Sequence, residues 1–204
     1  MRVAEPAAGT QPSEKRRNEI LENALTVFSR NGFAASRVDD ISAAAGISRA
    51  TFYRYFDGKD DTFDALVDLM GIEVIAAAEA LQPVTPDRAG RATLRTWMAA
   101  LIAITERWGT LVDEVIRPRD KNAVARYRAV GMTGRFAEIM GKRFSEGGVT
   151  DVEPAMAAIA ITAMTERMWH QIRTWNVEID REVVIDALAT MAMKMLHPKV
   201  VVSG

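Results

Sequence analysis

Residues 38–55 read VDDISAAAGISRATFYRY, and this stretch decides the fold. Two short helices that meet at a steep angle need apolar residues on their facing sides and glycine in the turn between them. Ile41, Ile47 and Phe52 have the spacing of the facing sides, and Gly46 stands in the turn. The pattern therefore predicts a helix-turn-helix, whose second helix in DNA-binding proteins lies in the major groove.

The sequence on both sides of this stretch also predicts helices. A helix begins at Glu14 and ends at the Asn31-Gly32 pair, Ser36 caps a second helix that runs to Ala45, and Ser48 caps a third. After residue 58, the prolines and glycines delimit further helices over 59–81, 88–108, 110–117, 120–146, 153–175 and 181–196. No stretch alternates long enough to indicate a strand.

We therefore expect an all-α protein in three parts. Residues 1–13, which are rich in Pro, Gly, Ala and Thr, form a disordered arm. Residues 14–58 form a three-helix helix-turn-helix domain that binds DNA, and residues 59–204 form a larger helical domain that binds an effector and dimerises.

Composition excludes several classes of protein. The chain has 204 residues, 49% of them hydrophobic, with no cysteine, two histidines and a net charge of -1. Cysteine-ligated zinc and thiol nucleophiles are excluded, and we expect neither a metal nor another cofactor. Neither a secretory signal nor a membrane-spanning stretch is present, so a cytoplasmic protein is expected. The near-zero charge excludes a non-specific nucleic-acid coat, whose phosphate contacts need a large positive excess.

Two wider patterns carry a resemblance to a known family. Residues 20–33 read IL-x-x-AL-x-x-F-x-x-x-GF, and residues 39–63 read DDIS-x-x-AGISRATFYRYFDGKDDTF. Over roughly residues 16–69 the chain resembles the TetR family of bacterial transcriptional regulators. It departs from the family pattern at Ser42, where alanine is usual, and at Arg49-Ala50, which replace Lys/Arg-Gly.

The helix-turn-helix supplies candidate DNA contacts. Arginine near the start of a recognition helix commonly binds guanine, so Arg49 is predicted to contact a base. The alternative interpretation is that Arg49 and Arg54 are ordinary solvated charges. The resemblance implies that Tyr53 and Lys59 bind phosphates. The predicted DNA-binding residues are Ser36, Arg37, Val38, Ser48, Arg49, Ala50, Thr51, Tyr53, Arg54 and Lys59.

The larger domain contains all four tryptophans and ten of the eleven methionines, a composition that suits an apolar ligand pocket. The resemblance implies a small-molecule effector, which we expect to be uncharged and largely apolar. The predicted pocket residues are Met98, Leu101, Ile102, Thr105, Trp108, Val112, Met132, Phe136, Met140, Met164, Met168 and Trp169, and the polar candidates beside them are Glu106, Asn122, Thr133, Glu166 and His170. The alternative is that these apolar side chains are helix-packing core.

The resemblance further implies that the last two helices form a four-helix bundle with a second copy. The predicted dimer contacts are Ala155, Ile159, Ala163, Val184, Leu188, Met191 and Met195. We thus expect a homodimeric repressor that leaves a palindromic double-stranded DNA operator when a small molecule binds. The alternative is a ligand-independent DNA-binding protein or an activator of the same fold. An enzyme is not expected, because no nucleophile stands beside a base and no glycine-rich phosphate loop is present.

Overall fold

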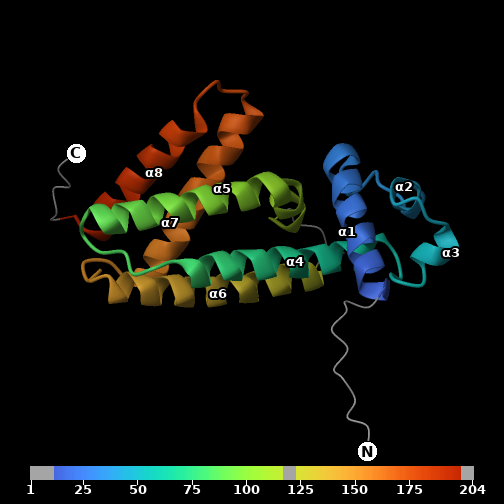
Figure 1. The fold of residues 1–204 in the computed structure, drawn as a ribbon, viewed down its shortest axis with the longest axis horizontal. Helices are drawn as coiled ribbons and strands as arrows, with labels where there is room; N and C mark the ends of the chain where they lie inside the picture. The colour runs from blue at the N-terminus through green and yellow to red at the C-terminus, as the bar shows by residue number, and fades with distance from the viewer. Residues whose placement is uncertain (1–11, 117–122, 199–204) are drawn as a thin grey trace, which may run out of the picture. The chain divides into compact units, whose positions relative to one another are not determined.

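The computed structural model describes residues 12–116 and 123–198, and within these ranges it contains helices and no strand (Figure 1). The all-α prediction is therefore confirmed for this part of the chain. The helices in order are α1 (Pro12–Asn31), α2 (Val38–Ala44), α3 (Arg49–Phe52), α4 (Lys59–Ala80), α5 (Arg88–Ile116), α6 (Ala123–Glu146), α7 (Pro154–Thr174) and α8 (Arg181–Leu196). No helix in the described ranges is both long and apolar enough to span a membrane.

The chain divides into two compact units, an N-terminal unit Met1–Leu66 and a C-terminal unit Val67–Gly204. The division falls inside α4, so one continuous helix contributes to both units. The N-terminal unit holds the helices α1 to α3, and the C-terminal unit holds α5 to α8.

Local signals set the turns of the N-terminal unit. Gly32 (φ 73°) and Gly46 (φ 63°) adopt the left-handed backbone that favours glycine, and each follows the end of a helix. Ser48 caps α3 by accepting a hydrogen bond from Thr51 N at 3.1 Å. The prediction that Ser36 caps α2 is wrong: the N-cap is Arg37, because the Ser36 hydroxyl instead donates to Gly32 O at 2.7 Å.

An aromatic cluster forms the core beneath these turns. The cluster consists of three buried rings: Phe28 of α1, Phe63 of α4, and Phe33, which follows α1. The ring centroids of Phe28 and Phe33 are 5.2 Å apart, and those of Phe33 and Phe63 are 4.7 Å apart. Ile41 and Phe52, the residues predicted to lie between α2 and α3, are fully buried. Large rings at these separations contribute packing energy beyond their buried area, so the helix-turn-helix is attached to a rigid support.

The predicted helix boundaries change at two places. α5 is one continuous helix across Gly109, where the sequence predicted two helices, because Trp108 and Leu111 on either side are both buried in the same packing face. A single glycine inside a helix costs only about 1 kcal/mol, which that burial offsets. α1 begins at Pro12, inside the predicted arm; residues 1–11 of that arm and residues 117–122 lie outside the described part of the chain.

The C-terminal unit is a layered helical bundle. α7 packs against both α5 and α6, and α8 packs against α5 (Figure 1). α4 lies along α6, where Glu79 and Arg135 form an ion pair at 3.5 Å. Buried apolar side chains from α5, α6, α7 and α8 share one core, which includes Met98, Met140, Ile161 and Leu188.

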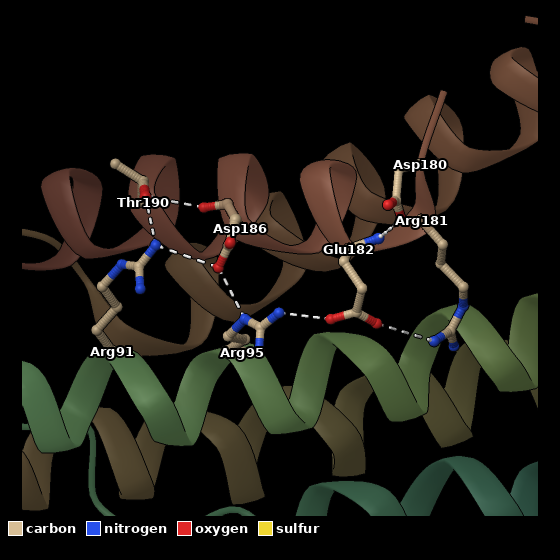
Figure 2. Close-up of polar contacts among 7 residues, drawn as sticks. All are labelled: Arg91, Arg95, Asp180, Arg181, Glu182, Asp186 and Thr190. Carbon is tan, nitrogen blue, oxygen red and sulfur yellow. Dashed lines mark hydrogen bonds and ion pairs between the residues drawn. The ribbon is translucent and has the colours of Figure 1, made fainter. Parts of the chain in front are cut away.

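A ladder of charged side chains joins α5 to α8 along the exposed edge of their contact (Figure 2). Arg95 donates to Asp186 Oδ1 at 2.7 Å and also pairs with Glu182, while Arg91 reaches Asp186 Oδ1 and Thr190 Oγ1 at 3.3 Å each. The hydrogen bond from Arg95, followed by the charges of both arginines, holds the pKa of the Asp186 carboxyl below its ordinary value. Asp186 is thus the shared acceptor of this ladder.

We expect replacement of Asp186 by Asn to lower the stability of the C-terminal unit at neutral pH and to have less effect in acid. A carboxyl with a lowered folded-state pKa contributes stability above its unfolded value of about 3.9, and that contribution is lost as the pH falls through the folded value. Thermal melts of wild type and Asp186→Asn at pH 7, 5 and 3 measure this difference. Glu178→Gln, which changes an exposed carboxylate on the α7–α8 connection, is the control. A difference in melting temperature that is the same at all three pH values would contradict the prediction.

Candidate nucleic-acid interface and ligand cavity

The exposed face of α3 gathers polar side chains above a buried anchor. Phe52 is fully buried and contacts the rings of Tyr53 and Phe56, with centroids 5.6 and 5.8 Å away. Because Phe52 faces inward, the neighbouring side chains face solvent. We call these residues the α3 surface; they are Ser48, Arg49, Ala50, Tyr53 and Arg54, and all of them are exposed.

Arg49 is held in place by two neighbours. Its Nη1 donates to Asp39 of α2 at 3.0 Å, and its Nη2 lies 3.4 Å from the Tyr53 hydroxyl. The hydrogen bond to Tyr53, followed by the charge of Asp39, raises the pKa of the Arg49 guanidinium. The pair with Asp39 is more than half exposed on both sides, so it orients the guanidinium without sequestering it from a ligand.

The other predicted DNA contacts differ in exposure. Arg37 is exposed, whereas Val38 and Thr51 are half-buried. Ser36 is 2% exposed and its hydroxyl is already bound to Gly32 O, so its side chain is not available to DNA. The prediction for the Ser36 side chain is therefore corrected: it stabilises the turn after α1.

Lys59 has a different environment from the one that the resemblance implies. Its ammonium donates to Phe33 O at 2.8 Å, Ala34 O at 3.2 Å and Ser36 O at 2.9 Å. An ammonium has three N–H donors, so all of them are used by backbone carbonyls. The ammonium also lies 4.6 Å from the centroid of the Phe33 ring. Lys59 thus joins the start of α4 to the α1–α2 connection, and it has no donor left for a phosphate in this structure.

A cavity of about 260 Å³ lies among α4, α5, α6 and α7. We call it the α4–α7 cavity. Its lining is mostly apolar, with three threonines and one carboxyl; the residues are Met70, Val74, Ile104, Thr105, Val112, Met132, Thr133, Phe136, Ile159, Thr162, Ala163 and Glu166. Every one of them belongs to the C-terminal unit.

The cavity includes four of the twelve predicted pocket residues, namely Thr105, Val112, Met132 and Phe136. Thr133 and Glu166, predicted as polar candidates, line it as well. The other pocket predictions are corrected because the side chains pack into or against the core of the unit; they are Met98, Leu101, Ile102, Trp108, Met140, Met164, Met168 and Trp169. Trp108 also donates its indole N–H to Glu73 at 2.7 Å. Of the remaining polar candidates, Glu106 and His170 are outside the lining, and Asn122 lies outside the described residues.

Sequence reasoning missed the contribution of α4, which supplies Met70 and Val74 to the cavity. Apolar residues at helical spacing line a cavity or fill a core equally well, so spacing cannot distinguish the two. The signal that separates them is a polar residue on an apolar face, and Thr162 and Glu166 are one helical turn apart on α7.

Glu166 is the one carboxyl among the described residues that line the cavity. It is half-buried, and it has no hydrogen bond or ion pair with any described residue. Burial raises the pKa of the Glu166 carboxyl, because removal from water disfavours the charged form.

Comparison with known proteins agrees with the geometry of the N-terminal unit. The family model described as "Bacterial regulatory proteins, tetR family" matches residues 20–66. The HTH-type transcriptional repressor KstR2 of Rhodococcus jostii strain RHA1 is 39% identical over 62 residues, which are 30% of this chain and 30% of that protein. The N-terminal unit therefore carries the helix-turn-helix domain of the TetR family.

Solved structures extend the likeness in fold to the C-terminal unit. The regulator PfmR from Thermus thermophilus is 25% identical, covers 86% of this chain and 97% of its own, and has a TM-score of 0.67. GusR of Salmonella enterica is 20% identical and covers 92% of this chain and 97% of its own, with a TM-score of 0.71. The sequence match to the curated relatives spans less than a third of their length, and the likeness of the C-terminal unit to known proteins is one of fold, to the solved structures.

The last two helices leave apolar side chains exposed, though not all of those predicted. Val184 and Leu188 were predicted as dimer contacts, but both are buried in the core of their own chain, because they face α5 and α7. Positions one residue earlier on α8 are exposed instead: Val183, Ala187 and Met191 lie four residues apart on one face. We call them the α8 stripe.

Of the predicted dimer contacts on α7 and at the end of α8, some are exposed and others are half-buried. Ile159 and Ala163 are exposed on α7 and also belong to the cavity lining. Ala155 and Met195 are half-buried. The outer face of α7 is therefore apolar next to the cavity, while the ends of the predicted contact region are partly covered by the chain itself.

We expect Lys59→Met to destabilise the N-terminal unit, because it leaves three carbonyls without their charged donor. The loss should be about 1.5–3 kcal/mol, the range for a hydrogen bond to a charged group. Hydrogen exchange of the amides of residues 33–47, followed by mass spectrometry, measures it. Lys15→Met, at an exposed position of α1, is the control.

The same variant distinguishes an internal role from a phosphate contact. A lysine that binds phosphate should lower the slope of DNA affinity against salt by about 1 when it is removed, with no change in hydrogen exchange. That result for Lys59→Met would contradict the internal role.

Proposed function

We propose that this chain is a homodimeric, sequence-specific DNA-binding transcriptional regulator, a repressor that leaves a palindromic operator when a small, largely apolar molecule binds its C-terminal unit. The observation that supports this proposal most directly is the α3 surface. A short capped helix holds an oriented arginine, a tyrosine hydroxyl and a second arginine in solvent above the buried Phe52.

Each group on the α3 surface has a chemical role in the proposal. Arg49 presents a planar guanidinium, which suits the O6 and N7 acceptors of guanine in the major groove. Tyr53 and Arg54 offer donors for phosphates, and these contacts set the register of the protein on the duplex. The net charge of -1 supports binding through this small surface rather than through a general basic field.

Dimerisation is proposed to involve α7 and α8. The α8 stripe and the exposed Ile159 and Ala163 of α7 present apolar and small side chains that permit close approach of another helix pair. A two-fold arrangement would place two α3 surfaces on half-sites about one helical turn, ~34–36 Å, apart on a palindrome.

Ligand release is proposed to act through α4. This helix supplies Lys59 to the N-terminal unit and Met70 and Val74 to the α4–α7 cavity, so it is shared by both sites. A ligand that favours one position of α4 would alter the affinity for the operator. The two binding events would then oppose each other by a coupling free energy of about 1–3 kcal/mol.

The alternative, a ligand-independent DNA-binding protein or an activator of the same fold, makes different predictions. A protein that organises DNA without sequence preference shows little difference between cognate and scrambled duplexes across salt concentrations. Activator and repressor are distinguished by whether the operator overlaps the promoter or lies upstream of it.

The direct test of the proposal is a gel-shift assay with DNA fragments from the region around the protein's own gene. Specific binding to a palindromic site at low salt, with a stoichiometry of two chains for each site, is the expected result. Failure to bind any such site more tightly than scrambled DNA would refute the proposal.

We expect Arg49→Ala to reduce discrimination at one base pair in each half-site by about 1–3 kcal/mol, because a bidentate contact to guanine would be lost. Gel shifts on the operator and on its single-base variants measure this loss. Arg88→Ala, at an exposed position at the start of α5, is the charge-matched control. Equal losses of affinity on cognate and scrambled DNA would show that Arg49 contacts only the backbone.

We expect Met191→Glu to dissociate the proposed dimer, because a charge on the α8 stripe would be buried in the interface without a partner. Sedimentation velocity of the wild type and the variant measures the change from two chains to one. Ile72→Glu places the same charge on an exposed apolar residue of α4 and should leave the dimer intact. A variant at Met191 that sediments like the wild type would place the interface elsewhere.

A further inference from the structure

Two of the threonine hydroxyls of the α4–α7 cavity offer a ligand hydrogen-bond acceptors rather than donors. The Thr105 hydroxyl donates its hydrogen to Leu101 O at 2.9 Å, and the Thr162 hydroxyl donates to Ala158 O at 2.8 Å. A hydroxyl has one hydrogen, so each of these side chains keeps only oxygen lone pairs for another partner. Two of the three threonines in the lining therefore offer acceptors and no donor.

Glu166 adds a third acceptor on the same side. It lies four residues after Thr162 on α7, so the two side chains occupy the same face of the helix. Its carboxyl has no partner among the described residues, and the described lining contains no lysine, arginine or histidine. The cavity thus combines an apolar wall with a cluster of acceptor oxygens that has no positive charge beside it in the described lining.

We propose that the ligand of the α4–α7 cavity is a small, largely apolar amine, whose ammonium is bound by the Glu166 carboxylate and the Thr162 hydroxyl oxygen. This inference rests on the proposed function in that it concerns the effector of the same regulator. It replaces the uncharged effector that the sequence predicts. The volume of about 260 Å³ is at the lower end for a ligand pocket, which restricts the amine to a compact hydrocarbon body.

The alternatives fit the lining less well. A carboxylate ligand would bring a second negative charge and further acceptors to a site whose described lining has no cation for them. An alcohol would satisfy one acceptor, but it would leave the carboxylate without a counter-charge. An ammonium donates charge-assisted hydrogen bonds, which are roughly twice as strong as neutral ones, and it supplies the missing charge. The raised pKa of the free Glu166 carboxyl agrees with a site whose charge is uncompensated until the ligand binds.

The test uses three probes with one carbon skeleton: 4-phenylbutylamine, 4-phenylbutan-1-ol and 4-phenylbutanoate. Isothermal titration calorimetry with the full-length protein at pH 7 is expected to show that the amine binds about tenfold more tightly than the alcohol, and that the acid binds weakest. In Glu166→Gln the amine should lose about tenfold in affinity while the alcohol is unchanged, because the amide keeps the shape and removes the charge.

Two further variants control the experiment. Glu106→Gln removes an exposed carboxylate of α5 that is outside the lining, and it should leave the preference for the amine unchanged. Thr162→Val removes one acceptor and should weaken the amine more than the alcohol, which keeps the test valid if Glu166→Gln does not fold. Equal binding of amine and alcohol, tighter binding of the acid, or no binding of any probe to the folded wild type would each overturn the inference.

The failure of this inference is distinguishable from the failure of the proposed function. A gel shift that shows specific operator binding, together with calorimetry that shows no preference for the amine, would retain the regulator and reject the ligand class. Preferential binding of the amine without any operator binding would retain the ligand class and reject the regulator.

Discussion

The ammonium of Lys59 is the interaction on which the helix-turn-helix depends. A single cation at the start of α4 binds the carbonyls of Phe33, Ala34 and Ser36, which belong to the connection between α1 and α2. Carbonyls beyond the end of a helix lack partners within the helix, and a cation is the group that stabilises them most strongly. The turn that begins α2 is therefore held from α4, and α2 in turn positions Asp39 against Arg49 of α3. Through these contacts, the half-buried ammonium of Lys59 supports the position of the exposed α3 surface.

The α4–α7 cavity can be described by its hydrogen-bond donors and acceptors in the same way, and here, unlike at Lys59, some of the acceptors have no partner among the described residues. In the N-terminal unit every donor of Lys59 has its acceptor, so the site is complete and structural. In the cavity the hydroxyls of Thr105 and Thr162 have given their hydrogens to their own helix, and Glu166 stands without a partner among the described residues. The proposed amine would supply the donors that this set of acceptors lacks.

Much of the N-terminal unit could be predicted from local sequence. Gly32, Gly46 and the cap at Ser48 act within a few residues, so their roles follow from the sequence and are confirmed by the backbone. The packing of the C-terminal unit was harder to predict from the sequence, because the apolar spacing on α5 identifies a buried face without showing which residues cover it. Val184 and Leu188 illustrate this limit: both are apolar residues of α8, and only packing against the neighbouring helices shows that they are core while Val183 and Met191 are exposed. A shift of one residue rotates a side chain by about 100° around the helix, which is enough to exchange the two faces.

The sequence alone determined the all-α class, the helix-turn-helix and its resemblance to the TetR family, since these depend on short-range signals and on a motif of contiguous residues. Tertiary structure decided the roles that depend on partners distant along the chain. Lys59 has the spacing of a phosphate contact, yet carbonyls 23 to 26 residues earlier use all of its donors. Glu166 is an ordinary acidic residue in the sequence, yet in the structure it lines a mostly apolar cavity among four helices. Hydrogen-bond satisfaction and burial are properties of the folded surroundings, and a residue's own identity does not specify them.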